Sequence, residues 1–275
     1  MIAQPRLVVF DVDGVLVTRP QGFGALQIPS TTQAAIQQLQ AENILCTVAT
    51  GRGYLRTLQA CGGRKWFNPS QLLIVEECKI VAAHGEILHA PLIDHHTLEA
   101  VAPLLTRKLV HFAGGCCPWN QHLYKFWACD VAARELIEQQ LALIAGQITE
   151  DAVEFIRWLK DDGTSMLALK TYGNQLPIPP EVSWTLNERI YNITAPDQDK
   201  GIALQKLADR LEIPLTRVVA CVNDHNDLPL ARLAGTVVVV GNKVPELTAL
   251  ATHYVETPED LHIALQAIFP EILSP

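Results

Sequence analysis

Polar segments that directly follow apolar runs hold most of the side chains in this sequence that are suited to catalysis. Asp11 and Asp13 follow one such run, and Thr50 follows a second. Far along the chain, Lys200 begins a helix-like pattern, and the acidic segment 223–227 follows a third apolar run. In an open parallel sheet, ligands bind beyond the carboxyl ends of the strands. We therefore expect these residues to meet in one crevice.

These residue types fit a transfer of phosphoryl groups. A carboxylate that attacks phosphorus needs the repulsion between the two negative charges to be cancelled, and Mg²⁺ does this with oxygen ligands. A lysine and a hydroxyl, here Lys200 and Thr50, can stabilise the equatorial oxygens. A second acid two residues from the nucleophile can protonate the leaving oxygen and later activate water. The sequence supplies every part of this reaction.

The segment Asp11-Val12-Asp13-Gly14 is by itself equally typical of an ordinary turn after a strand. Polar residues also end the predicted strands in the other half of the sheet. It is this recurrence that favours a shared site over four unrelated turns.

The first part of the chain alternates between buried strands and helices. Apolar runs with β-branched residues indicate strands, and apolar residues at helical spacing indicate helices. Glycines at 62 and 63 are expected to stop the second helix. The predicted elements are a strand at Leu7–Phe10, a helix capped by Ser30 and the following threonines, a strand at Ile44–Ala49, a helix from Gly51 to about Ala60, and a strand at Leu72–Val75.

The same alternation returns near the end of the chain, and it predicts a doubly wound parallel sheet with helices on both faces. The α/β core is assigned to residues 1–85 and 190–275. Its later elements are a helix at Gly201–Leu211, a strand at Val218–Val222, a helix at Leu228–Leu233, a strand at Thr236–Val240 and a final helix near Pro258–Ile268.

Residues 86–189 differ in pattern and are predicted to form an inserted α+β cap domain. This stretch holds four of the five tryptophans and a proline-rich loop near 177–180. Its predicted elements are helices near His96–Phe112 and Val131–Ala145 and strands at Phe155–Trp158 and Met166–Thr171.

The ordered segments resemble the motifs of the haloacid dehalogenase (HAD) superfamily. Within it, the sequence is most similar to the Cof-type hydrolase and sucrose-phosphatase branch, which carries a cap after the third strand. The matching segments are Asp11-Val12-Asp13-Gly14-Val15-Leu16, Ala49-Thr50-Gly51-Arg52, Asp199-Lys200-Gly201-Ile202-Ala203-Leu204 and Asn223 to Asp227. The likeness covers both core blocks, whereas the cap matches only in position and size.

The resemblance implies a role for each matching residue. Asp11 would be the nucleophile and Asp13 the acid/base. Phosphate or substrate would be bound by Thr50, Gly51, Arg52, Lys200 and Asn226. Mg²⁺ would be held by Asp11, the carbonyl of Asp13, Asn223 and Asp227, and Asn242 would support the site.

One residue departs from the superfamily's pattern. Asn223 stands where a metal-binding aspartate is usual, so the site loses one negative charge. An amide oxygen can still bind Mg²⁺, but the affinity should fall, or Asp224 could substitute as a ligand.

The resemblance leaves the reaction open between three possibilities. The first is hydrolysis of a small phosphorylated metabolite, such as a sugar phosphate, by a phosphatase. The second is a phosphomutase that acts on sugar phosphates. The third, motivated by Asn223, is a weakened protein that binds a phosphorylated ligand without turnover. Neither the substrate nor the oligomeric state follows from the sequence.

Composition and charge restrict the partners. The net charge of −8 disfavours nucleic acid and anionic membranes, and hydrophobic residues at 49% are enough for a sizeable core. Seven cysteines without a Cys-x-x-Cys pattern indicate reduced core thiols. No leader-like segment opens the sequence and no apolar run is long enough to span a membrane, so a soluble cytoplasmic protein is expected.

Two further groups of residues are candidate sites. His111, Cys116, Cys117 and His122 lie close together in the sequence, but their spacing fits no usual zinc pattern and zinc is disfavoured. His225 lies inside the late acidic segment and is a candidate for contact with the substrate. Signatures of serine hydrolases and P-loop proteins are absent from the sequence.

Overall fold

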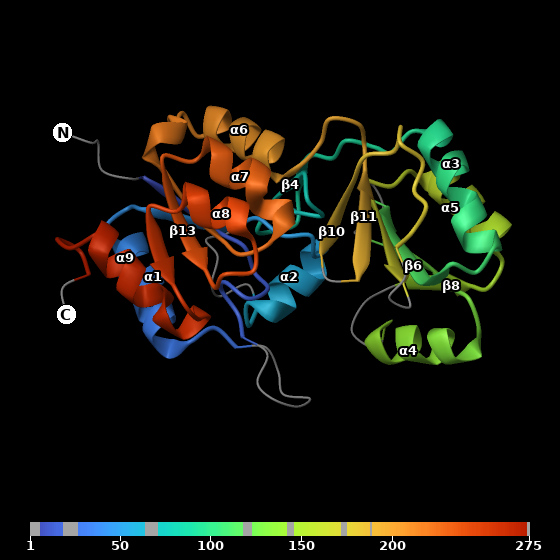
Figure 1. Ribbon diagram of the computed structural model, residues 1–275, viewed down its shortest axis with the longest axis horizontal. Coiled ribbons are helices and arrows are strands. Elements are labelled where there is room, and N and C mark those ends of the chain that lie inside the picture. The colour runs from blue at the N-terminus through green and yellow to red at the C-terminus, as the bar shows by residue number, and fades with distance from the viewer. Residues whose placement is uncertain are drawn as a thin grey trace. The chain divides into compact units, whose positions relative to one another are not determined.

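The computed structural model describes residues 6–18, 27–63, 71–117, 123–141, 146–171, 175–187 and 189–273. The chain divides into two compact units. The first unit comprises Met1–Val75, Ile80–Glu86 and Asp199–Pro275, and the second comprises Glu76–Lys79 and Ile87–Gln198. Figure 1 shows the elements of both units.

A five-stranded parallel sheet forms the centre of the first unit, with the strand order β14-β13-β12-β1-β2. Its central strands are almost wholly apolar and buried on both faces, as expected for a sheet that helices cover on both sides. The strands are β1 (Leu7–Phe10), β2 (Leu45–Val48), β12 (Val218–Val222), β13 (Thr236–Val240) and β14 (His253–Val255).

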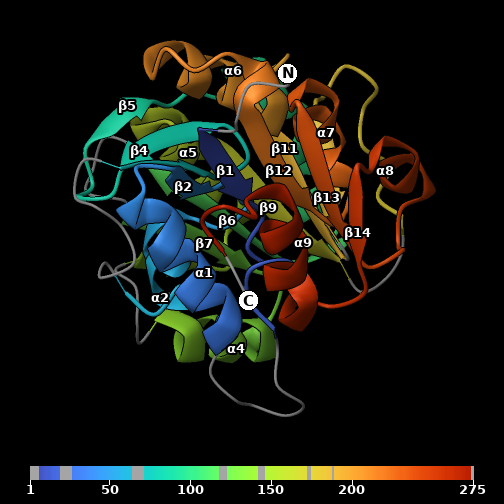
Figure 2. The same ribbon diagram turned by 90° about the vertical axis from the view of Figure 1, so that its left-hand side faces the viewer.

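Helices cover both faces of this sheet. Figures 1 and 2 show α1 and α9 together on one side and α6 and α7 on the other. The α-helices are α1 (Ser30–Ala41), α2 (Tyr54–Ala60), α6 (Lys200–Arg210), α7 (Leu228–Leu233), α8 (Pro245–Leu250) and α9 (Leu261–Ile268). Short 3-10 turns occur at Leu215–Arg217, His225–Asp227 and Pro258–Asp260. This is the doubly wound α/β core predicted from the sequence.

Most predicted elements of the first unit are confirmed, but two details were wrong. Helix α1 does begin at Ser30, yet Pro29 occupies the N-cap position and no side chain caps the helix. Strand β3 (Leu72–Val75) belongs to a three-stranded sheet, β3-β4-β5, with β4 at Lys79–Ala82 and β5 at Ile87–His89. A single parallel bridge, Ala49 to Ile74, joins it to the end of β2.

The second unit is built on a six-stranded sheet with the order β10-β11-β9-β6-β7-β8. Its neighbouring strands run antiparallel, except for the parallel pair β7 and β8. The strands are β6 (Val110–Cys117), β7 (Leu123–Ala128), β8 (Gly146–Thr149), β9 (Met166–Thr171), β10 (Trp184–Asn187) and β11 (Ile190–Thr194). The helices are α3 (His95–Thr106), α4 (Val131–Leu141) and α5 (Ala152–Asp162). This mixture has the α+β character predicted for the insert.

The predicted strand Phe155–Trp158 was wrong, because these residues lie inside helix α5. Asp151 caps the helix by accepting hydrogen bonds from the backbone N–H groups of Val153 and Glu154. The buried residues Phe155, Ile156 and Leu159 follow the spacing of one helical face. Tertiary burial along that face outweighs the β propensity of the aromatic and branched residues.

The predicted helix His96–Phe112 was too long. Helix α3 ends at Thr106, Lys108 has a left-handed φ of 52°, and strand β6 begins at Val110. Helix α4 ends at Leu141, and the remaining predicted helical residues, 142–145, lie outside the described residues.

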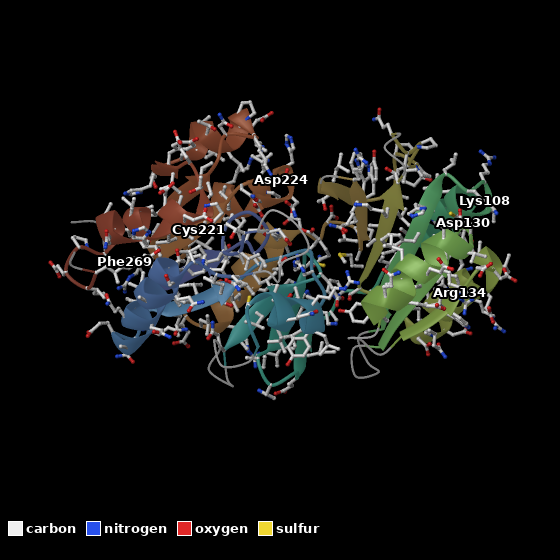
Figure 3. All side chains as sticks on the ribbon, turned by 90° about the horizontal axis from the view of Figure 1, so that it is seen from below. Lys108, Asp130, Arg134, Cys221, Asp224 and Phe269 are labelled. Carbon is white, nitrogen blue, oxygen red and sulfur yellow. The ribbon has the colours of Figure 1, made fainter. Side chains whose placement is uncertain are left out.

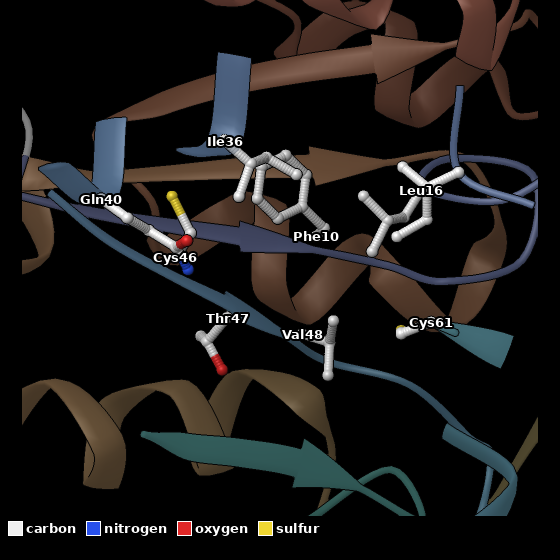
Figure 4. A pocket seen from close by; sticks show the side chains of 9 residues that line it. Phe10, Leu16, Ile36, Gln40, Cys46, Thr47, Val48 and Cys61 are labelled. Carbon is white, nitrogen blue, oxygen red and sulfur yellow. The ribbon is translucent and has the colours of Figure 1, made fainter. Parts of the chain in front are cut away.

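A small cavity of about 20 Å³ lies in the first unit beside β1 and β2 (Figure 4). Its lining is mostly apolar: Phe10, Leu16, Ile28, Ile36, Gln40, Cys46, Thr47, Val48 and Cys61. An apolar cavity of this size is a packing defect rather than a binding site, because a water inside it would find few polar partners.

Among the helices that the structure describes, none combines the length and the apolar character needed to cross a membrane.

Candidate active site

The carboxyl ends of β1, β12 and β2 bring the predicted residues of the first unit together. Asp11 follows β1 and Asn223 follows β12, and these two strands are neighbours in the sheet. The backbone N–H of Asp11 donates to the carbonyl of Cys221 at 2.9 Å, which continues the ladder to the edge of the sheet. Figure 3 labels Cys221, a residue of β12, and Asp224, which follows the end of that strand.

Lys200 is the centre of this site. Its Nζ atom donates to Asp11 Oδ1 at 2.8 Å and to Asp227 Oδ1 at 2.6 Å, and its side chain is completely buried. The lysine lies in the first turn of α6, where Asp199 caps the helix through the N–H of Ile202. One ammonium therefore links two carboxyl groups from opposite parts of the chain, and the formal net charge of these three side chains is −1 when all are ionised.

Close packing holds α6 in this place. A Cβ atom on Gly201 would come within 2.8 Å of the carbonyl oxygen of Pro229 in α7. Residue 201 must therefore be glycine if α6 is to pack here and Lys200 is to reach the two carboxylates.

Asp227 organises the loop after β12. Its Oδ2 accepts from the backbone N–H groups of Asn223 at 3.0 Å and Asp224 at 3.2 Å, while Oδ1 binds Lys200. Asp224 in turn accepts from the N–H of His225, so the two aspartates cap the short turn reciprocally. Both oxygens of Asp227 are thus engaged by protein donors.

Burial raises the pKa of Asp11 above that of an ordinary aspartate, because the charged form loses its hydration. The ammonium of Lys200 opposes this shift, and the nearby Asp227 adds to it. A further positive charge beside Asp11 would stabilise the ionised form of its carboxyl group.

Asp13 is held by Arg52 in a two-pronged ion pair. Arg52 Nε donates to Asp13 Oδ2 and Arg52 Nη2 donates to Asp13 Oδ1, each at 2.6 Å. Burial alone would lower the pKa of Arg52, but the hydrogen bond and charge of Asp13 raise it. The backbone N–H of Arg52 also donates to Thr50 Oγ1 at 3.1 Å, which connects this pair to the end of β2.

Asn223 reaches across to the loop that follows β1. Its Nδ2 donates to the backbone carbonyl of Asp13 at 2.9 Å. Its Oδ1 is buried and has no hydrogen-bond partner among the described residues. A buried amide oxygen that accepts no hydrogen bond is available to bind a cation.

The oxygens of Asp11, the Asp13 carbonyl and Asn223 suit Mg²⁺ in donor type, since Mg²⁺ prefers carboxylate and carbonyl oxygens. The charge is low for such a site. Among the described residues no three Asp, Glu, His or Cys side chains are grouped as metal ligands. A cation here would depend on Asp11 and on neutral oxygens.

Six of the predicted residues are joined by direct contacts: Asp11, Asp13, Arg52, Lys200, Asn223 and Asp227. Thr50 joins them through the backbone of Arg52, with Gly51 between, and Asn226 is buried in the same loop as Asp227. His225 and Asn242 are exposed. His122 and the side chains of Cys116 and Cys117 lie outside the described residues.

Sequence reasoning missed two of these contacts. The pairing of Arg52 with Asp13 was not foreseen, since Arg52 was assigned to phosphate alone. The bond from Asn223 to the Asp13 carbonyl also leaves no pattern in the sequence, because the two residues are 210 positions apart.

The sequence matches the profile of a family described as haloacid dehalogenase-like hydrolase over residues 8–115 and 144–267. It is 26% identical to HMP-PP phosphatase of Cronobacter sakazakii, over 96% of this chain and 93% of that protein. It is 21% identical to 5-amino-6-(5-phospho-D-ribitylamino)uracil phosphatase YitU of Bacillus subtilis, over 96% of this chain and 97% of that protein.

The fold is also similar to that of a solved phosphatase of the haloalkanoate (HAD) superfamily from Bacteroides thetaiotaomicron. The TM-score is 0.73 at 16% identity, and the alignment covers 96% of this chain and 95% of that one.

Proposed function

Because this chain belongs to the haloacid dehalogenase-like hydrolase family and is a phosphoric monoester hydrolase of that family, we propose that it hydrolyses a small phosphorylated metabolite through a phosphoryl group carried on Asp11. The observation that supports this most strongly is the Lys200 ammonium between Asp11 and Asp227. A buried cation in contact with a buried carboxylate at the end of a parallel strand is suited to holding a phosphoryl group beside a nucleophile.

In the first step, a carboxylate oxygen of Asp11 forms a bond to phosphorus as the bond from phosphorus to the leaving oxygen breaks. Asp13 gives its proton to that oxygen, so the alcohol departs neutral. In the second step, Asp13 takes a proton from water, whose oxygen attacks the same phosphorus. The bond to Asp11 breaks, inorganic phosphate leaves, and both aspartates return to their starting states.

In the structure Arg52 donates to both oxygens of the Asp13 carboxylate. For the first transfer Asp13 must be protonated, so one oxygen carries the proton while Arg52 holds the side chain through the other. We assign phosphate and substrate contacts to Thr50, Gly51, Arg52, Lys200 and Asn226, which lie at the strand ends or in the adjoining turns. His225 is exposed on the same loop and remains a candidate for contact with the substrate.

We propose Mg²⁺ as the cofactor, held by Asp11, the carbonyl of Asp13 and Asn223, with Asp227 or Asp224 contributing at the edge of the site. When bound, the ion would offset the negative charge that Asp11 and the phosphoryl group bring together. The unpartnered oxygen of Asn223 supports this assignment.

For the substrate, we propose a sugar phosphate or a similar small organic phosphate. The Bacillus relative is named for a substrate with a phosphorylated ribityl chain. The net charge of −8 makes nucleic acid a poor partner. The cytoplasmic location expected from the sequence remains a prediction, and so do the domain boundaries at 85 and 190.

The test is phosphate release from a panel of phosphorylated metabolites in Mg²⁺, with Asp11→Asn and Asp209→Asn assayed beside the wild type. Asp11→Asn should lose activity by at least about a thousandfold, because the nucleophile is gone. Asp209→Asn, the same change on the exposed face of α6, should keep full activity. Mass spectrometry of acid-quenched enzyme should find one added phosphoryl group that Asp11→Asn lacks.

Activity that survives unchanged in Asp11→Asn would end the proposal. Interconversion of sugar phosphate isomers without net release of phosphate would replace it with a phosphomutase. Binding of the metabolite without any turnover would replace it with the weakened binding protein that Asn223 suggests.

A further inference from the structure

The side chain of Asn223 ties together two loops that are far apart in the sequence. Nδ2 donates to the backbone carbonyl of Asp13 at 2.9 Å, and the backbone N–H of Asn223 donates to Asp227 Oδ2 at 3.0 Å. A carbonyl oxygen only accepts hydrogen bonds, so the nitrogen of the amide must face it. The orientation of the Asn223 amide is therefore fixed by its partner.

The loop after β1 is shaped to receive this amide. Gly14 has a left-handed φ of 78°, and a Cβ atom at this position would come within 2.3 Å of Asn223 Nδ2. Asn223 itself is buried. The amide thus occupies a closely fitted place between the two loops.

An aspartate at position 223 would behave in the opposite way. A carboxylate has no hydrogen to donate, so one of its oxygens would face the Asp13 carbonyl oxygen at a repulsive distance. It would also add a third buried negative charge to Asp11 and Asp227, which share the single ammonium of Lys200. A cation between the two oxygens would then be needed to hold the loops together.

We propose that Asn223 replaces a cation as the tie between these loops, so that the site is assembled and stable without a divalent ion. The cost is a weaker affinity for Mg²⁺, because the site carries one negative charge fewer than it would with an aspartate. This inference rests on the proposed function for the existence of a Mg²⁺ site. It concerns how the protein is held together rather than what it hydrolyses.

The experiment measures thermal unfolding of the full chain in EDTA and in Mg²⁺, without substrate. Wild type should melt at nearly the same temperature in both. Asn223→Asp should have a lower melting temperature than wild type in EDTA. Mg²⁺ should raise the melting temperature of this variant by several degrees, about 2–4 °C for each tenfold decrease in the Mg²⁺ dissociation constant. Calorimetric titration with Mg²⁺ should give a dissociation constant at least about tenfold tighter for Asn223→Asp than for wild type.

Two further variants separate the effect of losing the hydrogen bond from Asn223 to Asp13 from the effect of adding a negative charge. Asn223→Leu removes the hydrogen bond without adding charge, so its melting temperature should fall in EDTA and Mg²⁺ alike. Asn43→Asp makes the same chemical change at an exposed position of left-handed φ, which aspartate also tolerates, and should melt as wild type does. If Asn223→Leu does not fold, the comparison of wild type with Asn223→Asp still decides the question.

The proposal is overturned if wild type gains as much from Mg²⁺ as Asn223→Asp does, or if Asn223→Asp is as stable as wild type in EDTA. Neither result depends on catalysis. If the wild type releases phosphate but needs Mg²⁺ for its stability, the inference about Asn223 is wrong and the proposed function stands. If the wild type is equally stable with and without Mg²⁺ but hydrolyses none of the metabolites, only the proposed function is wrong.

Discussion

Each unit of the molecule contains a completely buried lysine that contacts a completely or almost completely buried carboxylate, and the two clusters differ in how their oxygens are satisfied. In the first unit, Lys200 contacts Asp11 and Asp227. In the second, Lys79 contacts Glu76 at 3.3 Å within a turn whose carboxylates are completely buried. Both clusters withdraw charges from water, which is costly unless partners compensate.

The cluster of the second unit is closed by neutral side chains. Ser165 Oγ donates to Glu76 Oε2 at 2.5 Å, and Asn192 Nδ2 donates to Glu77 Oε1 at 2.8 Å. These bonds hold a turn in which both glutamates have left-handed φ angles, 51° and 65°. Such angles strain residues other than glycine, so the hydrogen bonds offset a backbone cost.

The cluster of the first unit is left partly open instead. The pKa of Asp11 is raised by burial, and the neighbouring Asn223 keeps an oxygen without a partner among the described residues. The difference between the two clusters indicates that a buried ion pair is a candidate for function where neighbouring polar atoms remain available to bind another ligand. A fully satisfied one serves the fold.

The sharpest test of this comparison is the matched pair Lys200→Met and Lys79→Met. Removing either ammonium leaves buried carboxylates uncompensated, so each variant should lose about 3–5 kcal/mol of unfolding free energy. Only Lys200→Met should also lose turnover, by about 10²–10³-fold, because its ammonium is the group proposed to hold the phosphoryl group. Urea unfolding and phosphate release at a temperature where both are folded measure the two effects.

Lys79→Met with reduced turnover per folded molecule would remove the distinction between the clusters. So would a Lys200→Met enzyme that works as well as wild type.

A smaller effect is expected where Asn192 meets Glu77. Asn192→Ala leaves the buried Glu77 carboxylate without this donor and should cost about 1.5–3 kcal/mol of stability. Glu77→Gly removes the carboxylate and relieves the left-handed φ at that position. In the Glu77→Gly background, Asn192→Ala should therefore cost at least about 1 kcal/mol less. Equal costs in the two backgrounds would show that the pair is not coupled.

Arg52→Lys should slow turnover about tenfold, because an ammonium cannot reproduce the two-pronged contact with Asp13 and loses roughly 1.5 kcal/mol of hydrogen bonding to a charged group. The melting temperature should hardly change, since both side chains are partly exposed. Steady-state kinetics with a hydrolysed metabolite measures the turnover number. An unchanged value would remove Arg52 as the residue that positions Asp13.

The smallest effect is expected at an exposed ion pair of similar length. Arg134 and Glu138 of α4 contact each other at 2.8 Å, as closely as Lys200 and Asp11 do, but both are open to water. Glu138→Gln should leave the melting temperature and the activity where they are, because solvent screens such pairs. A clear drop in the melting temperature would mean that burial is not what separates these ion pairs.

The sequence predicted the first unit well, because its strands are local and strongly apolar. β1, β3, β12 and β13 were placed to the residue, as was α7. A strand buried on both faces gives a continuous apolar run, and the polar residues that follow it mark the edge where ligands bind.

The second unit was harder to predict, because its elements have one buried and one exposed face. In α5, Phe155 and Ile156 have the β propensity of a strand, and only their packing decides for a helix. The segment Glu76-Glu77-Cys78-Lys79 has the composition of a surface turn, yet all four residues are buried. No local pattern distinguishes a buried charge from an exposed one, since its partners Ser165 and Asn192 lie far along the chain.

The position of β1 has a consequence for how the protein is made. In the sheet, β1 lies between β2 and β12, and β12 is synthesised after the second unit. Until then one edge of β1 has no strand to pair with, while the second unit, which ends at Gln198, is already synthesised. Asp11 can meet Lys200, 189 residues later, only after the second unit has been synthesised. The site can therefore assemble only after the whole of the second unit has been synthesised.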